Sequence, residues 1–170
     1  MQDKIGWIGL GSMGNRMAKN LAKNGYQMLV TDKMDTSAAP QSAHVATTNS
    51  EVISEANILI LSIPAGPDTL EITQEILNSP SSSVEIVIDT STIGIPDAKK
   101  AAELLSKKGI EYVDAPVSGG IAGADSATLA VMVGCKEDIF EKVQPILKCI
   151  GANIFHVGPN PGQGLSLIHI

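Results

Sequence analysis

One glycine-rich turn limits how this chain can fold more than any other feature of its sequence: Gly9, Leu10, Gly11, Ser12, Met13 and Gly14. The apolar segment before it, residues 4–9, predicts a strand, and the helical spacing of apolar residues after it predicts a helix over residues 12–24. Glycines at the first, third and sixth positions of such a turn permit a tight bend, let a pyrophosphate approach the backbone and allow close helix–strand packing. The helix N-terminus would supply free N–H groups for the phosphates. The flanking pattern favours a dinucleotide site over an ordinary turn with chance glycines.

The rest of the chain alternates short apolar segments with helical patterns, which is typical of βαβ units. Further strands are predicted over residues 26–31, 44–47, 58–63, 85–89, 110–114, 128–134 and 153–157, and further helices over residues 49–56, 67–78, 95–108 and 136–149. Asn49 or Ser50 is expected to cap the first of these helices, and residues 116–125 are expected to form a glycine-rich loop. The 170 residues suit one domain. We therefore expect a Rossmann-type, doubly wound α/β fold with a mostly parallel sheet and helices on both faces.

Asp32 ends the second predicted strand, where an acidic residue meets the adenosine ribose in dinucleotide-binding folds. A carboxylate there accepts hydrogen bonds from the 2′-hydroxyl and repels a 2′-phosphate, so it favours NAD over NADP. Lys33 would instead favour NADP, because its positive charge would attract the 2′-phosphate. The alternative for Asp32 is a solvated loop carboxylate.

Three further segments follow strand ends, where ligands lie in open α/β sheets. Pro64 follows one strand and Thr92 the next, so both are candidates for lining a cofactor cleft, although each segment alone better suits a simple strand-to-helix turn. Ser118, Gly119 and Gly120 would expose consecutive backbone N–H groups, a small nest suited to a carboxylate. A flexible connection is an equal alternative for this last segment.

The charge balance excludes several classes of partner. The net charge is −6, and the chain has no block of Lys or Arg, so nucleic acid and anionic membranes are poor candidates. No apolar run is long enough to cross a bilayer, and no targeting segment is evident, so the cytoplasm is the expected compartment.

The cysteines and histidines offer little chemistry in this pattern. Cys135 and Cys149 are expected to be reduced, buried residues, since no metal-ligand spacing surrounds them. His44, His156 and His169 have no carboxylate partner that the spacing indicates. A structural role is expected for all three, so no acid–base residue is evident.

Four segments together resemble the β-hydroxyacid dehydrogenases, a family that includes 3-hydroxyisobutyrate dehydrogenase and, more remotely, 6-phosphogluconate dehydrogenase. They are IGLGSMGNRMAKNL, VIDTSTIGIPDA, DAPVSGGIAGADSATLAVMVG and GPNPGQG, and the likeness extends over residues 4–164. The third segment is far more specific than the glycine turn alone.

The resemblance implies a set of roles. The six residues of the glycine-rich turn would hold the pyrophosphate and Asp32 the ribose of NAD or NADP, with NAD favoured. Pro64 and Thr92 would lie along the nucleotide, and Ser118, Gly119 and Gly120 would bind the carboxylate of a small-molecule substrate. The parent protein would be a homo-oligomer that transfers hydride between the cofactor and a 3-hydroxy acid or its semialdehyde.

The likeness ends at Gly164. Family members place a lysine four residues later, where it polarises the reacting oxygen, but this chain has Ile168 there, so no catalytic residue is expected within it. We expect residues 1–164 to form the dinucleotide-binding domain, residues 165–170 to be a non-native or truncated tail, and the all-helical second domain of the family to be absent. An apolar patch would then be exposed near the tail. The alternative is a non-catalytic nucleotide-binding module or scaffold protein.

Overall fold

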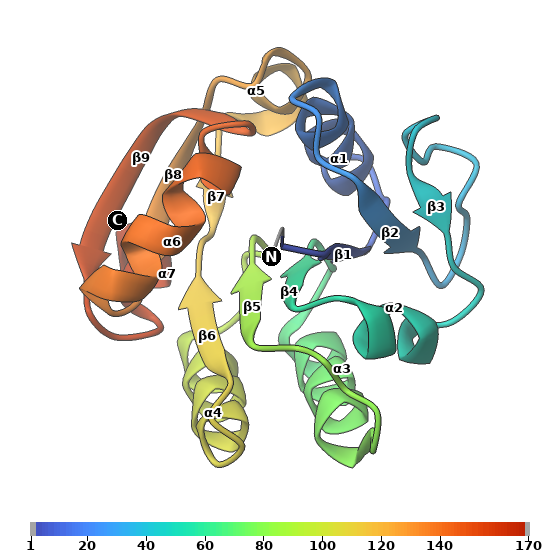
Figure 1. Ribbon diagram of the computed structural model, residues 1–170. Coiled ribbons are helices and arrows are strands. Elements are labelled where there is room, and N and C mark those ends of the chain that lie inside the picture. The colour runs from blue at the N-terminus through green and yellow to red at the C-terminus, as the bar shows by residue number, and fades with distance from the viewer. Residues whose placement is uncertain (1–2, 169–170) are drawn as a thin grey trace.

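The structure, a computed structural model, describes residues 3–168 and the side chains of residues 3–167. The strands are β1 (Ile5–Ile8), β2 (Met28–Thr31), β3 (His44–Val45), β4 (Ile58–Leu61), β5 (Ile86–Asp89), β6 (Glu111–Asp114), β7 (Val117–Ser118), β8 (Leu129–Gly134) and β9 (Gly151–Gly158). The helices are α1 (Gly14–Lys23), α2 (Asn49–Glu55), α3 (Gly66–Asn78), α4 (Ile95–Ser106), α5 (Gly120–Ser126), α6 (Glu137–Leu147) and α7 (Gln163–Ile168). Strands and helices alternate along most of the chain, as the sequence predicts (Figure 1).

The nine strands within residues 3–168 form one sheet in the order β3-β2-β1-β4-β5-β6-β8-β7, with β9 paired to β8. The pairs from β3 through to β6 are parallel, and so is the pair of β8 with β9. Only the contacts of β8 with β6 and β7 are antiparallel among those described. The mostly parallel sheet that the sequence predicts is confirmed, and the strand order reverses beside β1, which is where α/β folds of this type bind ligands.

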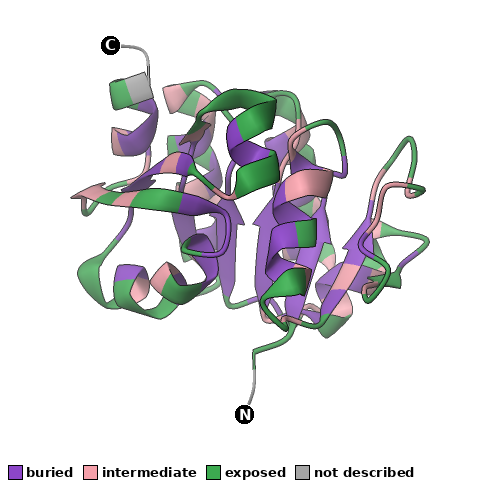
Figure 2. Ribbon diagram, turned by 90° about the horizontal axis from the view of Figure 1, so that it is seen from above, coloured by how far each residue is buried: buried purple, intermediate pink, exposed green. Residues whose placement is uncertain are grey.

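Helices cover both faces of the sheet, and each face has its own apolar core. On one face, Met17 and Leu21 of α1 and Val143 of α6 pack against the strands. On the other face, residues of α2, α3 and α4, such as Ile53 and Ile76, form a second cluster. Figure 2 shows the buried strands between helices that are exposed on their outer sides. The doubly wound fold class is thus confirmed.

Two local predictions are wrong. Residues 116–125 are not only a loop: they contain β7, where Val117 pairs with Val131 of β8, and the short helix α5. Gly119 immediately precedes α5 and has a φ of +135°, a conformation that residues with side chains disfavour, so a glycine suits this position. The cap of α2 is Thr48, whose side chain accepts a hydrogen bond from Glu51 N, and not Asn49 or Ser50.

Candidate cofactor-binding site

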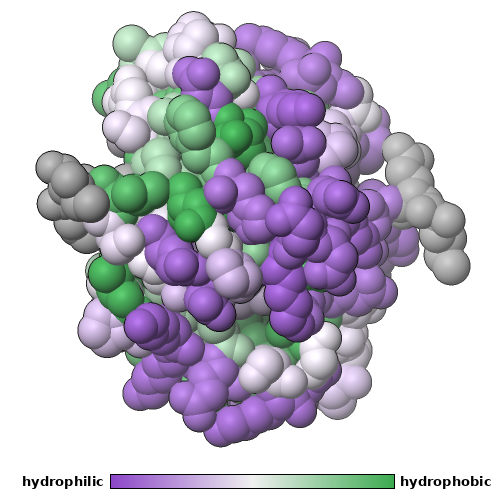
Figure 3. Space-filling view, turned by 90° about the vertical axis from the view of Figure 1, so that its left-hand side faces the viewer, coloured by the Kyte–Doolittle hydropathy of each residue, from purple (hydrophilic) through white to green (hydrophobic). Residues whose placement is uncertain are grey.

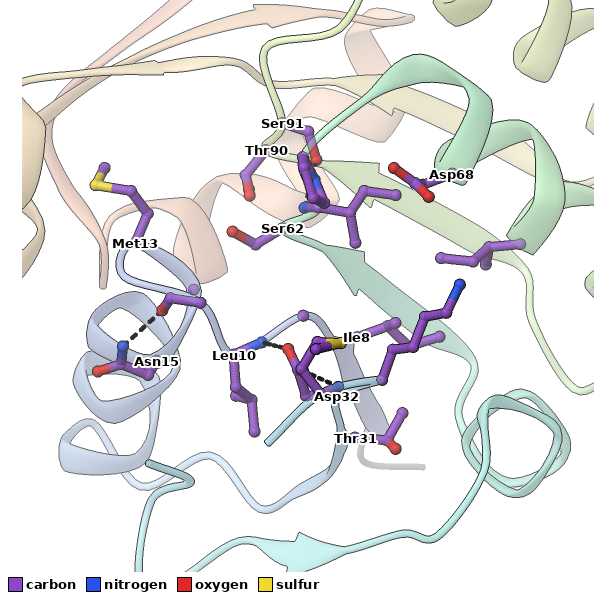
Figure 4. Close-up of a pocket in the computed structure, with 18 of the residues that line it drawn as sticks. Ile8, Leu10, Met13, Asn15, Thr31, Asp32, Ser62, Asp68, Thr90 and Ser91 are labelled. Atoms are coloured by element: carbon purple, nitrogen blue, oxygen red, sulfur yellow. Dashed lines mark hydrogen bonds between the residues drawn. The ribbon is translucent and has the colours of Figure 1, made fainter. Parts of the chain in front are cut away.

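A cavity of about 1240 Å³ opens at the carboxyl ends of β1, β2, β4 and β5. Figure 4 shows side chains from these strand ends and from α1 and α3 around it. The lining includes most of the residues that the sequence singles out: Gly9, Leu10, Gly11, Ser12, Met13, Gly14, Asp32, Pro64, Thr92 and Gly120. Ser118 and Gly119 do not belong to this lining. The fold therefore brings the predicted cofactor residues together, although they come from the separate connections that follow β1, β2, β4 and β5.

The three glycines of the turn differ in what surrounds them. A Cβ on Gly9 would lie 2.1 Å from Ser62 O, and one on Gly14 would lie 2.1 Å from Gly9 O. Those two positions therefore pack backbone against backbone. A Cβ on Gly11 would meet no heavy atom within 4 Å, and Gly11 lines the cavity. The space at Gly11 is thus free on the protein side, which suits a group that must approach the backbone closely.

Asp32 is tied into the glycine turn as well as facing the cavity. Its Oδ2 accepts a hydrogen bond from Leu10 N at 2.6 Å, and its Oδ1 accepts from Met34 N at 2.7 Å and Asp35 N at 3.1 Å (Figure 4). Burial raises the pKa of the Asp32 carboxyl, but the backbone donors lower it by more, so the pKa lies below its ordinary value. Asp32 is therefore ionised at neutral pH and can accept further hydrogen bonds from a ligand.

The charged lining of the cavity is mainly acidic. Besides Asp32, it contains the carboxyl groups of Asp35, Asp68, Glu71 and Glu75. Among the lining residues the single Lys or Arg is Lys33. Arg16 is directed elsewhere, since its Nε lies 2.8 Å from Asp125 Oδ1 of α5 and its Nη1 donates to Ser12 O. This distribution of charge disfavours further negative charge beside Asp32.

The loops that follow β4 and β5 form the other side of the cavity. Ile63 N donates to Ser91 Oγ at 2.9 Å, and Thr90 Oγ1 donates to Leu61 O at 2.7 Å. Figure 4 places Thr90 and Ser91 across the cavity from Asp32. The segments that hold Pro64 and Thr92 are thus held together by hydrogen bonds that the sequence did not indicate.

The predicted carboxylate nest lies at the start of α5. Ser118 is exposed in β7, Gly119 precedes α5, and Gly120 lines the cavity with a φ of +63°. Consecutive left-handed glycines of this kind can direct neighbouring N–H groups to one side. The binding of a carboxylate by these residues stays a prediction.

His156 corrects one expectation. Its Nδ1 lies 3.0 Å from Glu137 Oε2, its ring stacks on Phe140 at 4.4 Å between centroids, and its Nε2 is 2.6 Å from Cys135 O. The expectation that this histidine lacks a carboxylate partner is therefore wrong, because β9 brings it beside the start of α6. His156 does not line the cavity.

The other titratable residues behave more nearly as expected. Cys135 and Cys149 are buried free thiols, and burial raises the pKa of Cys135 to about 12. His44 is exposed on β3, and His169 lies outside the described residues. Within residues 3–168, no group of three or more His, Cys, Asp or Glu side chains could hold a metal ion.

Asp114, at the end of β6, holds the start of α7. Its Oδ2 accepts hydrogen bonds from Gly162 N at 2.8 Å, Gly164 N at 3.1 Å and Leu165 N at 3.4 Å. Burial raises the pKa of Asp114 to about 6, even though these donors oppose the rise. Sequence reasoning missed this contact because the partners lie about 50 positions apart and two of them are glycines.

The face of the molecule that carries β9 and α7 is partly apolar. Phe155 of β9 has 52% of its surface exposed and Leu167 of α7 has 47% exposed. Figure 3 views this face and shows hydrophobic groups gathered beside hydrophilic ones. In the part of the chain that the structure describes, no helix is both long and apolar enough to cross a membrane.

Comparisons with known proteins show the family to which the chain belongs. Residues 4–158 match the family described as the NAD binding domain of 6-phosphogluconate dehydrogenase. The chain is 40% identical to 2-(hydroxymethyl)glutarate dehydrogenase from Eubacterium barkeri, with 91% of this chain and 53% of that protein covered. It is 36% identical to 3-hydroxyisobutyrate dehydrogenase from Pseudomonas aeruginosa, with the same coverage of both chains.

A solved structure of Mycobacterium tuberculosis 3-hydroxyisobutyrate dehydrogenase with L-serine superposes with a TM-score of 0.90 at 33% identity, covering 99% of this chain and 58% of that one. The chain thus spans about half the length of the relatives it matches. These findings confirm the resemblance inferred from the four sequence segments. The chain belongs to the family of the NAD binding domain of 6-phosphogluconate dehydrogenase, and its relatives are hydroxyacid dehydrogenases.

Proposed function

We propose that this domain binds NAD(H) in the cavity and presents the nicotinamide ring for hydride exchange with a 3-hydroxy acid or its semialdehyde. One observation carries the proposal: the glycine turn, with free space at Gly11, faces the same cavity as the ionised carboxylate of Asp32. The relatives named above, which are hydroxyacid dehydrogenases, support the choice of substrate class.

The residues around the cavity fit this cofactor. The free space at Gly11 and the N-terminus of α1 would receive the pyrophosphate, with N–H groups and the positive end of the helix dipole offsetting the acidic lining. Asp32 would accept hydrogen bonds from the ribose, while Pro64 and Thr92 would lie along the nicotinamide half. Ser118, Gly119 and Gly120 would hold the substrate carboxylate. The bound cofactor would supply or accept the hydride, and the protein would orient it.

Cofactor preference gives one test. We expect this chain to bind NADH more tightly than NADPH, and we expect Asp32→Asn to reduce that preference by about tenfold, or ~1.4 kcal/mol, because a 2′-phosphate no longer meets a negative charge. Titration calorimetry with both cofactors measures the ratio. Lys33→Gln is the matched control and will not narrow the preference. Tighter binding of NADPH by the unsubstituted protein would contradict the role of Asp32.

A non-catalytic NAD-binding module is the second candidate, because Ile168 stands where family members place the catalytic lysine. An aliphatic residue cannot donate a proton or stabilise an alkoxide, a contribution on the order of a hundredfold in rate. We therefore expect the 170-residue chain to bind NADH but to leave NADH absorbance unchanged with 3-hydroxyisobutyrate, glycerate or related hydroxy acids. Measurable turnover by this chain would show that it contains an acid that we have not identified.

The gene discriminates between the two candidates. A reading frame with Lys at position 168 and more than about a hundred further codons would favour the dehydrogenase, since a second domain of that size completes the cleft. A stop shortly after codon 170 would favour the binding module. Failure of the chain to bind NADH would contradict both.

A further inference from the structure

A buried carboxylate lies directly behind the cavity. Asp89, at the end of β5, has only 1% of its surface exposed and does not line the cavity. Its Oδ2 accepts hydrogen bonds from Thr69 Oγ1 at 3.0 Å and Tyr112 OH at 2.9 Å, and its Oδ1 accepts from Ser91 N at 2.9 Å. Burial raises the pKa of Asp89, and the hydrogen bonds oppose the rise. Every one of these partners donates, which suits the ionised, acceptor-only form of the carboxyl group.

The hydrogen bonds of Asp89 reach the cavity through Ser91. The backbone of Ser91 donates to Asp89, and the hydroxyl of Ser91 accepts from Ile63 N at 2.9 Å. Ser91 lies in the loop after β5 and Ile63 in the loop after β4, and both residues line the cavity. The carboxylate thus connects two cavity loops that come from neighbouring strands.

Two further hydrogen bonds anchor this carboxylate to the surrounding fold. Thr69 lies in the first turn of α3, which follows the β4 loop directly, and it is fully buried. Tyr112 belongs to β6, the neighbour of β5 in the sheet. Asp89 therefore joins α3, β6 and both loops, whereas Asp32 and the glycine turn belong to β1 and β2, on the far side of β4.

We propose that Asp89 is a positioning residue for cofactor binding, which fixes the spacing of the loops 62–65 and 90–92 and thereby shapes the nicotinamide half of the cavity. The proposal rests on the proposed function, since it assumes that the nicotinamide lies between these loops. The adenosine half, formed by the glycine turn and Asp32, is built without any hydrogen bond to Asp89.

Paired ligands separate the two halves. NADH carries the nicotinamide, and ADP-ribose carries the adenosine and pyrophosphate without it. We expect Asp89→Asn to weaken NADH binding by roughly tenfold, because the amide NH2 replaces an acceptor and leaves one buried donor without a partner. The affinity for ADP-ribose will change less than about twofold. Titration calorimetry of both ligands gives the ratio of NADH affinity to ADP-ribose affinity. A general loss of protein stability would not change this ratio.

Two threonine substitutions provide a second test of the proposal if Asp89→Asn does not fold. Thr69→Val removes one donor to Asp89, whereas Thr73→Val, on the same helix and equally buried, removes only a hydrogen bond to Thr69 O. Thr69→Val will lower the NADH to ADP-ribose affinity ratio, and Thr73→Val will leave it unchanged. Equal losses for both ligands, or an unchanged ratio in Thr69→Val, would overturn the positioning role. If the unsubstituted protein binds neither ligand, the proposed function itself fails.

Discussion

Replacing Gly11 with Val will reduce NADH affinity at least about a hundredfold, or ~2.7 kcal/mol, and will leave the folded structure intact. A Cβ at this position has no protein atom within 4 Å, so we expect the substitution to leave the stability of the fold nearly unchanged. The same branched side chain would occupy the space beside the backbone that the pyrophosphate needs. Titration calorimetry measures the affinity, and thermal unfolding measures the stability.

Gly14→Val is the control, because we expect it to lower the stability of the fold, which Gly11→Val leaves nearly unchanged. Its Cβ would lie 2.1 Å from the Gly9 carbonyl oxygen, a backbone atom that can move only if β1 or α1 shifts. The melting temperature of this variant will fall, whereas that of Gly11→Val will stay near that of the unsubstituted protein. Equal NADH affinity in Gly11→Val and the unsubstituted protein would contradict the assignment of the turn.

The stability of the protein will depend on pH through Asp114. Its pKa of about 6 in the folded protein lies above the ordinary value of 3.8, because burial and the nearby charge of Asp89 outweigh the three backbone donors. The folded state therefore binds this proton more tightly than the unfolded state. The stabilisation from Asp114 is fully present below about pH 4 and is lost as pH rises through about 6, by ~3 kcal/mol in total.

Comparison with Asp114→Asn isolates this contribution. The asparagine oxygen can still accept the hydrogen bonds that start α7, but the side chain does not titrate. Urea unfolding between pH 4 and 7.5 will show the unsubstituted protein losing stability relative to the variant as pH rises. Parallel stability curves for the two proteins would show that Asp114 does not carry the pH dependence.

The strands and helices of this fold could be predicted where a local pattern encodes them. Residues 58–61 and 86–89 are apolar runs that read as buried strands, and the helix over residues 95–106 has an apolar face. The prediction of a loop over residues 116–125 was wrong because α5 is short and rich in small residues. Leu129 of β8 packs so closely here that a Cβ on Gly119 or Gly123 would lie 3.1 or 3.0 Å from its Cδ2.

The candidate site was predictable to a similar extent. The glycine turn, Asp32, Pro64 and Thr92 could be found because strand ends in a parallel sheet meet at one edge. The hydrogen-bond networks of Asp89 and Asp114 could not be predicted from the sequence. Apart from Ser91 N, the donors to these two carboxylates are hydroxyls and backbone amides that lie 20 to 51 positions away in the chain. A carboxylate that folding buries looks, in sequence, like any other residue at a strand end.

The central position of β1 has a consequence for the order in which the protein is made. β1 pairs with β4, and Gly9 packs against Ser62, so the glycine turn at the start of the chain is completed by residues about 50 positions later. A ribosome-bound chain will have released the entire turn well before the strand that supports it emerges. We therefore expect the nascent chain to bind a cofactor only after β4 and Ser62 have left the exit tunnel, although the glycine turn is translated much earlier.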